Sequence, residues 1–182
     1  MATVDEHRDV DERRDHVARI LMAWHAERPG LDVSPVAIFG RITRIDRYQA
    51  AAMRTVYRRH RLDAGEYDVL AALRRSGPGY RLTPTDLYRS VLVTSATMTE
   101  RLDRLERRNL IRRLPAARDR RSVLVELTPE GRDAFDRACG NLLDAEATLL
   151  DGLSATDRSA LAALLSKLAF LLEHEQVGSS DR

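Results

Sequence analysis

The chain has 182 residues, of which 43% are hydrophobic and 32% charged, and its formal net charge is +2. That length allows one core of normal size, or one lobe with a long helical appendage. The N-terminal stretch MATVDEHRDVDERRD is acidic and no apolar run approaches ~18 residues, so we expect a cytoplasmic protein without a signal peptide or membrane span. Cys139 is the single cysteine and the five histidines are scattered, which predicts no disulfide, no metal site and no cofactor.

The small net charge conceals a strong segregation along the chain. Residues 74–121 carry thirteen arginines against five acidic residues, and residues 41–62 carry seven arginines against one, whereas residues 122–182 sum to −6. Nearly all the cations are arginines, whose planar fork suits phosphates and guanine edges. A basic middle with acidic ends indicates a nucleic-acid-binding lobe carried on a separate scaffold.

Two helices are predicted in the N-terminal third. Apolar residues at helical spacing from Val17 to Trp24 predict an amphipathic helix that ends before Pro29-Gly30. Ser34-Pro35 then opens a second helix, with Ser34 as its N-cap, and apolar positions trace one face of it to about His60.

Three shorter helices follow. The third starts at Asp63 or Ala64 and stops at Ser76-Gly77-Pro78-Gly79, and Thr83-Pro84-Thr85-Asp86 repeats the start signal for a short fourth helix. Thr94 or Ser95 caps a fifth helix that runs to Asn109, a residue suited to a left-handed stop. Two helices in such close succession predict a helix-turn-helix.

A β-hairpin is expected directly after the helix-turn-helix. Residues 110–114 and 122–127 are β-prone runs, they flank the arginine-rich stretch LPAARDRRS, and Thr128-Pro129-Glu130 caps a new helix immediately afterwards. A hairpin in this place is a wing. We therefore predict a mostly α fold, in which a winged helix-turn-helix lobe is carried on a helical dimerisation scaffold.

The C-terminal region is predicted to be helical to about Glu175, with a fresh start at Ser154. Its leucines, between Leu161 and Leu172, form a stripe too wide for a helix lying on water, so they pack in the chain's own core or against another copy. We expect scaffold helices in 1–62, the DNA-binding lobe in 63–128, dimerisation helices in 129–175 and a disordered tail in 176–182.

Residues 35–131 resemble the MarR-type winged helix-turn-helix regulators. The resemblance rests on the order of EYDVLAALRRSGPGYRLTPTDLYRSVLVTSATMTERLDRLERRNLIRR, the element Asp119-x-Arg121 and VLVELTPEG. Thr97 and Ala96 are small departures from the family pattern, and the N-terminal extension is longer than the family minimum. The resemblance implies a homodimer whose two lobes bind a pseudo-palindromic operator in double-stranded DNA.

The DNA-binding residues are expected on the helix-turn-helix and the wing. A recognition helix needs short hydrogen-bonding side chains in its first turns, where it approaches base edges and phosphates. The candidates on the two helices are Thr83, Thr94, Ser95, Thr97, Thr99 and Arg101. Simple helix capping by the hydroxyl side chains, and a solvated helix face for the arginine, are the alternatives.

In the wing, the candidates are Arg118, Asp119, Arg120 and Arg121. Asp119 can pair with Arg121 and hold its guanidinium extended toward a narrow, negative minor groove. A solvated run of charges is the alternative for the three arginines.

A small effector is also expected, by resemblance. In one urate-responsive branch of the family, an added N-terminal helix carries a tryptophan, and an aspartate and arginines complete the ligand site. Trp24, Asp68, Arg101 and Arg113 stand at the matching positions of this chain, which implies an anionic aromatic ligand. Alternatively, Trp24 simply packs on the apolar stripe of its helix.

These features favour a ligand-responsive transcriptional regulator, acting as a repressor that an anionic or phenolic effector releases from DNA. A winged-helix module with an architectural or protein-binding role explains the fold but leaves the polar recognition-helix side chains unused. An enzyme is the weakest interpretation, because the chain has no phosphate-cradling glycine loop and no nucleophile beside a base, so no catalytic residue is proposed.

Overall fold

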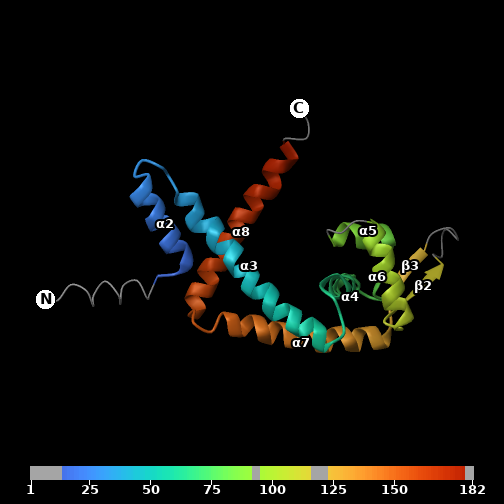
Figure 1. Cartoon of the computed structure of the whole chain (residues 1–182). Coiled ribbons are helices and arrows are strands. Elements are labelled where there is room, and N and C mark those ends of the chain that lie inside the picture. Colours follow the sequence, from blue (N-terminus) through green and yellow to red (C-terminus); the bar gives the residue numbers. More distant parts are fainter. Residues whose placement is uncertain (1–13, 92–94, 116–122, 179–182) are drawn as a thin grey trace. The chain divides into compact units, whose positions relative to one another are not determined.

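The computed structural model describes residues 14–91, 95–115 and 123–178, with backbone alone for 95–97 and 175–178 (Figure 1). The chain forms two compact units, residues 1–51 and 52–182. The division therefore falls inside the second predicted helix; the boundaries between scaffold and lobe that the sequence suggested, at residues 62 and 128, stay a prediction. Within the described ranges, no helix combines the length and the apolarity that crossing a bilayer requires.

The described elements follow the predicted order. The helices are α2 (His16–Glu27), α3 (Ser34–Arg59), α4 (Ala64–Arg75), α5 (Pro84–Ser90), α6 (Ser95–Arg107), α7 (Pro129–Leu149) and α8 (Ala155–Gly178). The strands are β1 (Arg81–Leu82), β2 (Ile111–Pro115) and β3 (Val123–Leu127). The chain is thus mostly helical with a small sheet, as predicted.

Side-chain caps define most of the helix starts. Asp63 accepts a hydrogen bond from the backbone N–H of Glu66, which places the start of α4 where the sequence predicted it. Asp15 caps α2 in the same manner and also pairs with Arg41 at 2.7 Å, which ties α2 to α3 within the N-terminal unit. Ser34 is the first residue of α3, and so lies inside the helix and not at the N-cap position that the sequence predicted; its N–H donates to the carboxylate of Asp32.

The junction after α6 explains the motif Leu127-Thr128-Pro129-Glu130-Gly131. Asn109 adopts a positive φ of 55°, which ends the helix as predicted. The hydroxyl of Thr128 accepts from the N–H of Gly131 at 2.9 Å and lies within hydrogen-bonding distance of the Leu110 carbonyl oxygen. One threonine therefore caps α7 and fixes the chain that leaves α6.

The three strands form an antiparallel sheet in the order β1-β3-β2. The sequence did not predict the two-residue strand β1, which pairs Arg81 with Glu126 and Leu82 with Val125. Apolar side chains from α4, α5, α6, α7 and the sheet meet in one core, whose largest fully buried side chains are Leu70, Leu73, Leu87, Leu105 and Ile111. This core fixes the two helices of the helix-turn-helix against the sheet.

The C-terminal helix is longer than expected. Helix α8 continues to Gly178, although the sequence suggested a tail from residue 176. Residues 179–182 of that tail lie outside the described part of the chain. Most leucines of α8 remain exposed within this chain, Leu164 to 67%, whereas Leu168 is partly buried.

Candidate nucleic-acid interface

The helix-turn-helix consists of α5 and α6, joined by a short connection after Val91. Thr83 caps α5 by accepting from the N–H of Asp86 at 3.1 Å, and its hydroxyl donates to the Asp86 carboxylate at 2.7 Å. This hydroxyl therefore already has two partners within its own helix start. A DNA contact by Thr83 has to share or replace one of them.

Helix α6 occupies the place of the recognition helix. It begins at Ser95, and Met98, Leu102 and Leu105 on one side of it are buried in the lobe core, as the sequence predicted. Thr99 is exposed on α6. Thr94 lies outside the described residues, as do the side chains of Ser95 and Thr97, so their proposed contacts with bases remain predictions.

The wing is the hairpin of β2 and β3. Its register runs from Ile111 opposite Leu127 to Pro115 opposite Val123, so the last residue of β2 pairs with the first residue of β3. The tip itself, residues 116–122 with Arg118, Asp119, Arg120 and Arg121, lies outside the described residues. The hairpin base thus supports a wing, and the roles of the tip residues remain predictions.

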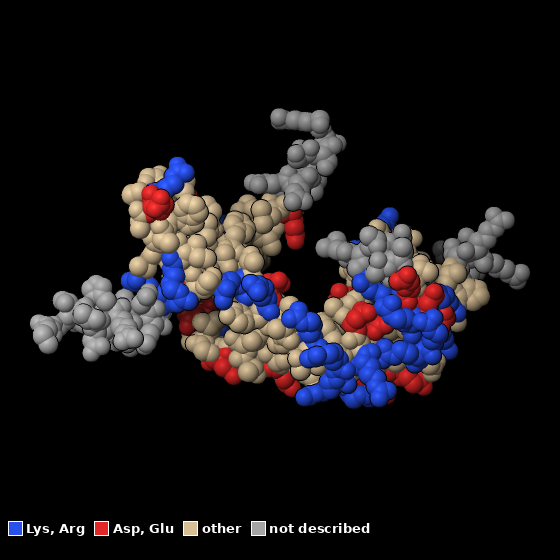
Figure 2. Space-filling model, viewed as in Figure 1, with Lys and Arg blue, Asp and Glu red and all other residues tan. Residues whose placement is uncertain are grey.

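Many arginines of the lobe are paired with acidic residues. Arg74 binds Asp136 at 3.1 Å. Arg81 and Arg112 both bind the buried Glu126, whose pKa is lowered chiefly by the hydrogen bond from Arg112 and also by Arg81, against the effect of burial. Figure 2 shows arginine and acidic side chains interleaved on the lobe. The net charge of residues 74–121 therefore overstates the positive charge that is available to DNA.

Arg101 points inward, toward α4. Its guanidinium lies so close to Gly65 that a Cβ added there would be 2.5 Å from one terminal nitrogen and nearer still to Nε. Two nitrogens of this guanidinium are buried without a hydrogen-bond partner among the described residues. Asp68 lies near enough for the charge of Arg101 to lower its pKa, although burial raises that pKa by more. The structure thus brings two of the four predicted ligand residues together.

The other two predicted ligand residues are placed differently. Arg113 donates to Asp103 at 2.6 Å and also pairs with Glu106, so acidic residues of α6 already hold it. Trp24 is 43% exposed on α2, in the N-terminal unit. An effector that binds Arg113 has to share this side chain with two carboxylates or displace them.

Sequence reasoning missed Gly65, Glu66 and Glu126. Glu66 is 4% exposed and Glu126 is 6% exposed, and each accepts from two arginines. The spacing Asp63-x-x-Glu66 is the signature of a capping box, so the position of Glu66 was detectable. The identity of its arginine partners was not, because Arg104 and Arg108 lie about forty residues further along the chain.

The MarR family model matches residues 62–123, which contain α4, the helix-turn-helix and the start of β3. The HTH-type transcriptional regulator PecS of Dickeya dadantii is 36% identical over 152 residues, which are 84% of this chain and 92% of that protein. The chain belongs to the MarR family.

Solved structures of MarR-family proteins agree with this assignment. A MarR variant of Escherichia coli in complex with operator DNA has a TM-score of 0.62 and 26% identity, covering 76% of this chain and 99% of that one. Bordetella bronchiseptica BpsR, whose DNA binding is regulated by 6-hydroxynicotinic acid, has a TM-score of 0.62 and 26% identity, covering 72% and 92%. This MarR-family member is therefore a winged helix-turn-helix transcriptional regulator by family, and its relatives are regulators and not enzymes.

Proposed function

We propose that this MarR-family regulator binds a pseudo-palindromic operator as a homodimer, represses transcription by blocking access to that DNA, and is released by a small anionic or phenolic effector. One observation carries the proposal. A helix-turn-helix packed on a β-hairpin base lies in a chain that matches 92% of the length of PecS. No further domain is needed for repression by blockade, because a bound dimer occupies the DNA itself.

Homodimer formation is supported by the apolar surface that each part of the chain leaves exposed. In the N-terminal unit, Ile38, Phe39 and Ile45 are 54%, 50% and 59% exposed on α3. On α8, Leu164 and Phe170 are 67% and 59% exposed. A soluble monomer rarely exposes so many large apolar side chains, and a second copy is the simplest cover for them.

The DNA proposal is tested by selecting a preferred duplex from a random pool with the unmodified protein. We expect a pseudo-palindrome whose half-site centres are ~34–36 Å apart, because two recognition helices of a dimer enter successive major grooves. Affinity should fall steeply with salt as arginines displace counterions. Arg121→Ala should lower affinity for all sequences, whereas Thr97→Ala should relax the sequence preference.

Two results would contradict this proposal. If the unmodified protein selected no sequence, an architectural or protein-binding role would replace the regulator. If Arg121→Ala bound the selected duplex as tightly as the unmodified protein at moderate salt, the wing would not contact DNA.

The effector proposal rests on Arg101 and Asp68. A guanidinium with two buried nitrogens that have no hydrogen-bond partner among the described residues favours an anion, and DNA binding by the relative BpsR is regulated by 6-hydroxynicotinic acid. An effector releases DNA only if it binds the DNA-incompetent state more tightly, and the shift cannot exceed that difference in affinity. We propose Asp68, Arg101 and Arg113 as its polar partners, with Trp24 as a stacking surface.

A thermal-shift screen of small aromatic acids, followed by DNA release, tests the effector proposal. Trp24→Ala should keep operator binding but lose the response to an acid found in the screen. If Trp24→Ala responded normally, or if it unfolded the dimer, Trp24 would be a packing residue and not a ligand contact.

A further inference from the structure

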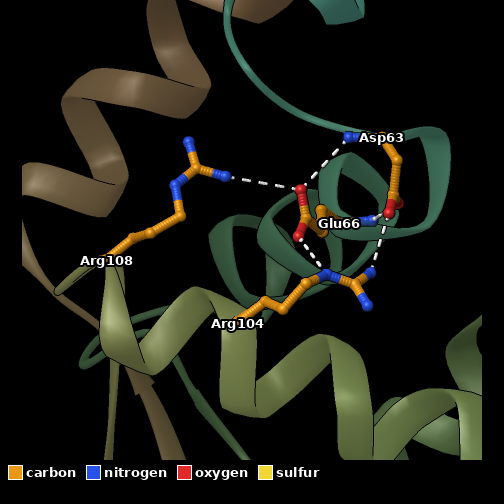
Figure 3. Close-up of polar contacts among 4 residues, drawn as sticks. All are labelled: Asp63, Glu66, Arg104 and Arg108. Atoms are coloured by element: carbon orange, nitrogen blue, oxygen red, sulfur yellow. Dashed lines mark hydrogen bonds and ion pairs between the residues drawn. The ribbon is translucent and has the colours of Figure 1, made fainter.

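The first turn of α4 receives arginine side chains from α6. Glu66 stands in this turn and its carboxylate is buried, with 4% of the residue exposed. One oxygen accepts from Arg104 Nε at 2.8 Å, and the other lies 3.4 Å from a terminal nitrogen of Arg108 (Figure 3). The second oxygen also accepts from the backbone N–H of Asp63 at 3.1 Å, and Asp63 itself binds Arg104 at 2.8 Å. These contacts thus connect the start of α4 to the C-terminal end of α6 and to the residue that follows it.

The two arginines reach Glu66 from different heights along α6. Arg104 lies in the last turn of the helix and Arg108 directly follows its end, so about 6 Å of helix axis separates them. In Figure 3 their guanidinium groups approach the carboxylate from two sides. A helix held through two such points resists both sliding along its axis and rotation about it.

The apolar core alone leaves these two motions less restricted. Met98, Leu102 and Leu105 anchor α6 in the lobe, but apolar contacts are not directional and tolerate small shifts. Recognition of bases requires a more exact position of α6 than apolar contacts provide, because a hydrogen bond between a side chain and a base edge weakens steeply when its geometry changes. An angular restraint on α6 therefore matters most for the part of binding that depends on sequence.

We infer that Glu66 is a positioning residue for base recognition: by holding Arg104 and Arg108 it sets the rotation and height of the recognition helix α6 in the major groove. The inference rests on the proposed function, since it needs a chain that reads DNA sequence. Glu66 itself does not touch the DNA, and it acts only through α6.

The lobe contains a matched control for this role. Glu126 is also a buried carboxylate held by two arginines, Arg81 and Arg112, but these come from β1 and β2 and not from α6. Glu66→Gln and Glu126→Gln therefore remove the same charge from similar surroundings. A purely structural role predicts the same behaviour of both variants toward DNA.

The test uses the duplex that the unmodified dimer selects from a random pool, and a scrambled duplex of equal length. For Glu66→Gln we expect the ratio of the two affinities to fall by about tenfold, comparable to one mismatched base pair, while binding to the scrambled duplex does not weaken, because the substitution removes a negative charge from the lobe. For Glu126→Gln we expect the ratio of the two affinities to change by less than about threefold. The melting temperature of both variants should fall, because each substitution removes the charge from a buried, hydrogen-bonded carboxylate.

An unchanged ratio for Glu66→Gln, or an equal loss in both variants, would overturn the inference and leave the proposed function standing. A wild-type protein that prefers no sequence would overturn both. If Glu66→Gln did not fold, Arg108→Gln would replace it, because this variant removes one of the two anchors and keeps the buried carboxylate paired with Arg104. The ratio of specific to scrambled affinity should then fall, while the slope of log affinity against log salt decreases by no more than about one phosphate contact. An unchanged ratio would again refute the positioning role of Glu66.

Discussion

Replacement of Gly131 by alanine is expected to destabilise the lobe through its backbone. Gly131 lies in the first turn of α7, beside the chain that leaves α6. A Cβ at this position would lie 2.8 Å from Leu127 Cδ1 and 2.9 Å from the Leu110 carbonyl carbon, and closer still to that carbonyl's oxygen. A side-chain movement can relieve the contact with Leu127, but only a backbone shift can relieve the contact with Leu110.

The size of the effect follows from what this shift disturbs. The Leu110 carbonyl accepts from the N–H of Thr128 at 3.2 Å and lies 3.0 Å from the Thr128 hydroxyl, and each hydrogen bond contributes about 1 kcal/mol. Forcing an extra methyl into a packed site costs about 1–3 kcal/mol more, and the higher helix propensity of alanine offsets about 1 kcal/mol. We therefore expect Gly131→Ala to lower the free energy of unfolding by about 2–4 kcal/mol, or Tm by roughly 4–16 °C.

Gly140→Ala is the matched control, because Gly140 lies in the same helix and an added Cβ would have nothing within 4 Å. That variant should be as stable as the unmodified chain or up to about 1 kcal/mol more stable. Urea and thermal unfolding at equal protein concentration measure both variants. A Gly131→Ala protein as stable as the control would refute the backbone argument.

Three further outcomes are expected. Leu164→Asp should yield monomers or insoluble protein in sedimentation velocity, because the charge would enter the proposed dimer contact; a fully dimeric, soluble variant would contradict this. Gly65→Ala should push the Arg101 guanidinium away at little cost in stability, since the clash involves the end of a flexible side chain, and the pKa of Asp68 should then rise because Arg101 lowers it; an unchanged Asp68 titration by NMR would count against this. The pKa of Glu126 is lowered in the fold, so its ionisation stabilises the protein above about pH 4.5 and that contribution is lost as the pH falls through the lowered pKa. The difference in the free energy of unfolding between the unmodified protein and Glu126→Gln, measured by urea unfolding, should therefore become smaller in acid. A difference that stayed constant between pH 7 and pH 3 would contradict this prediction.

Local signals in the sequence determined the order and the ends of most elements. Asp63, Thr83 and Thr128 each cap a helix through their own side chains, and Asn109 ends α6 with a positive φ. These features depend on residues within four positions of one another, so a single pass along the chain finds them. The hairpin after the helix-turn-helix was predictable for the same reason.

The tertiary structure decided which charges remain available. By sequence, Arg101 and Arg113 were equivalent candidates for an anion, yet Arg113 is held by Asp103 and Glu106 while Arg101 lies buried over Gly65. The strand β1 likewise exists only because β3 lies beside it, about forty-five residues later in the chain. Local propensity carries no information about partners at such separations, because the partner is set by how the helices and the sheet pack around one core. The sequence by itself therefore determined a winged helix-turn-helix of the MarR type, and only the packed lobe decided which arginines are bound to carboxylates and how the recognition helix is held.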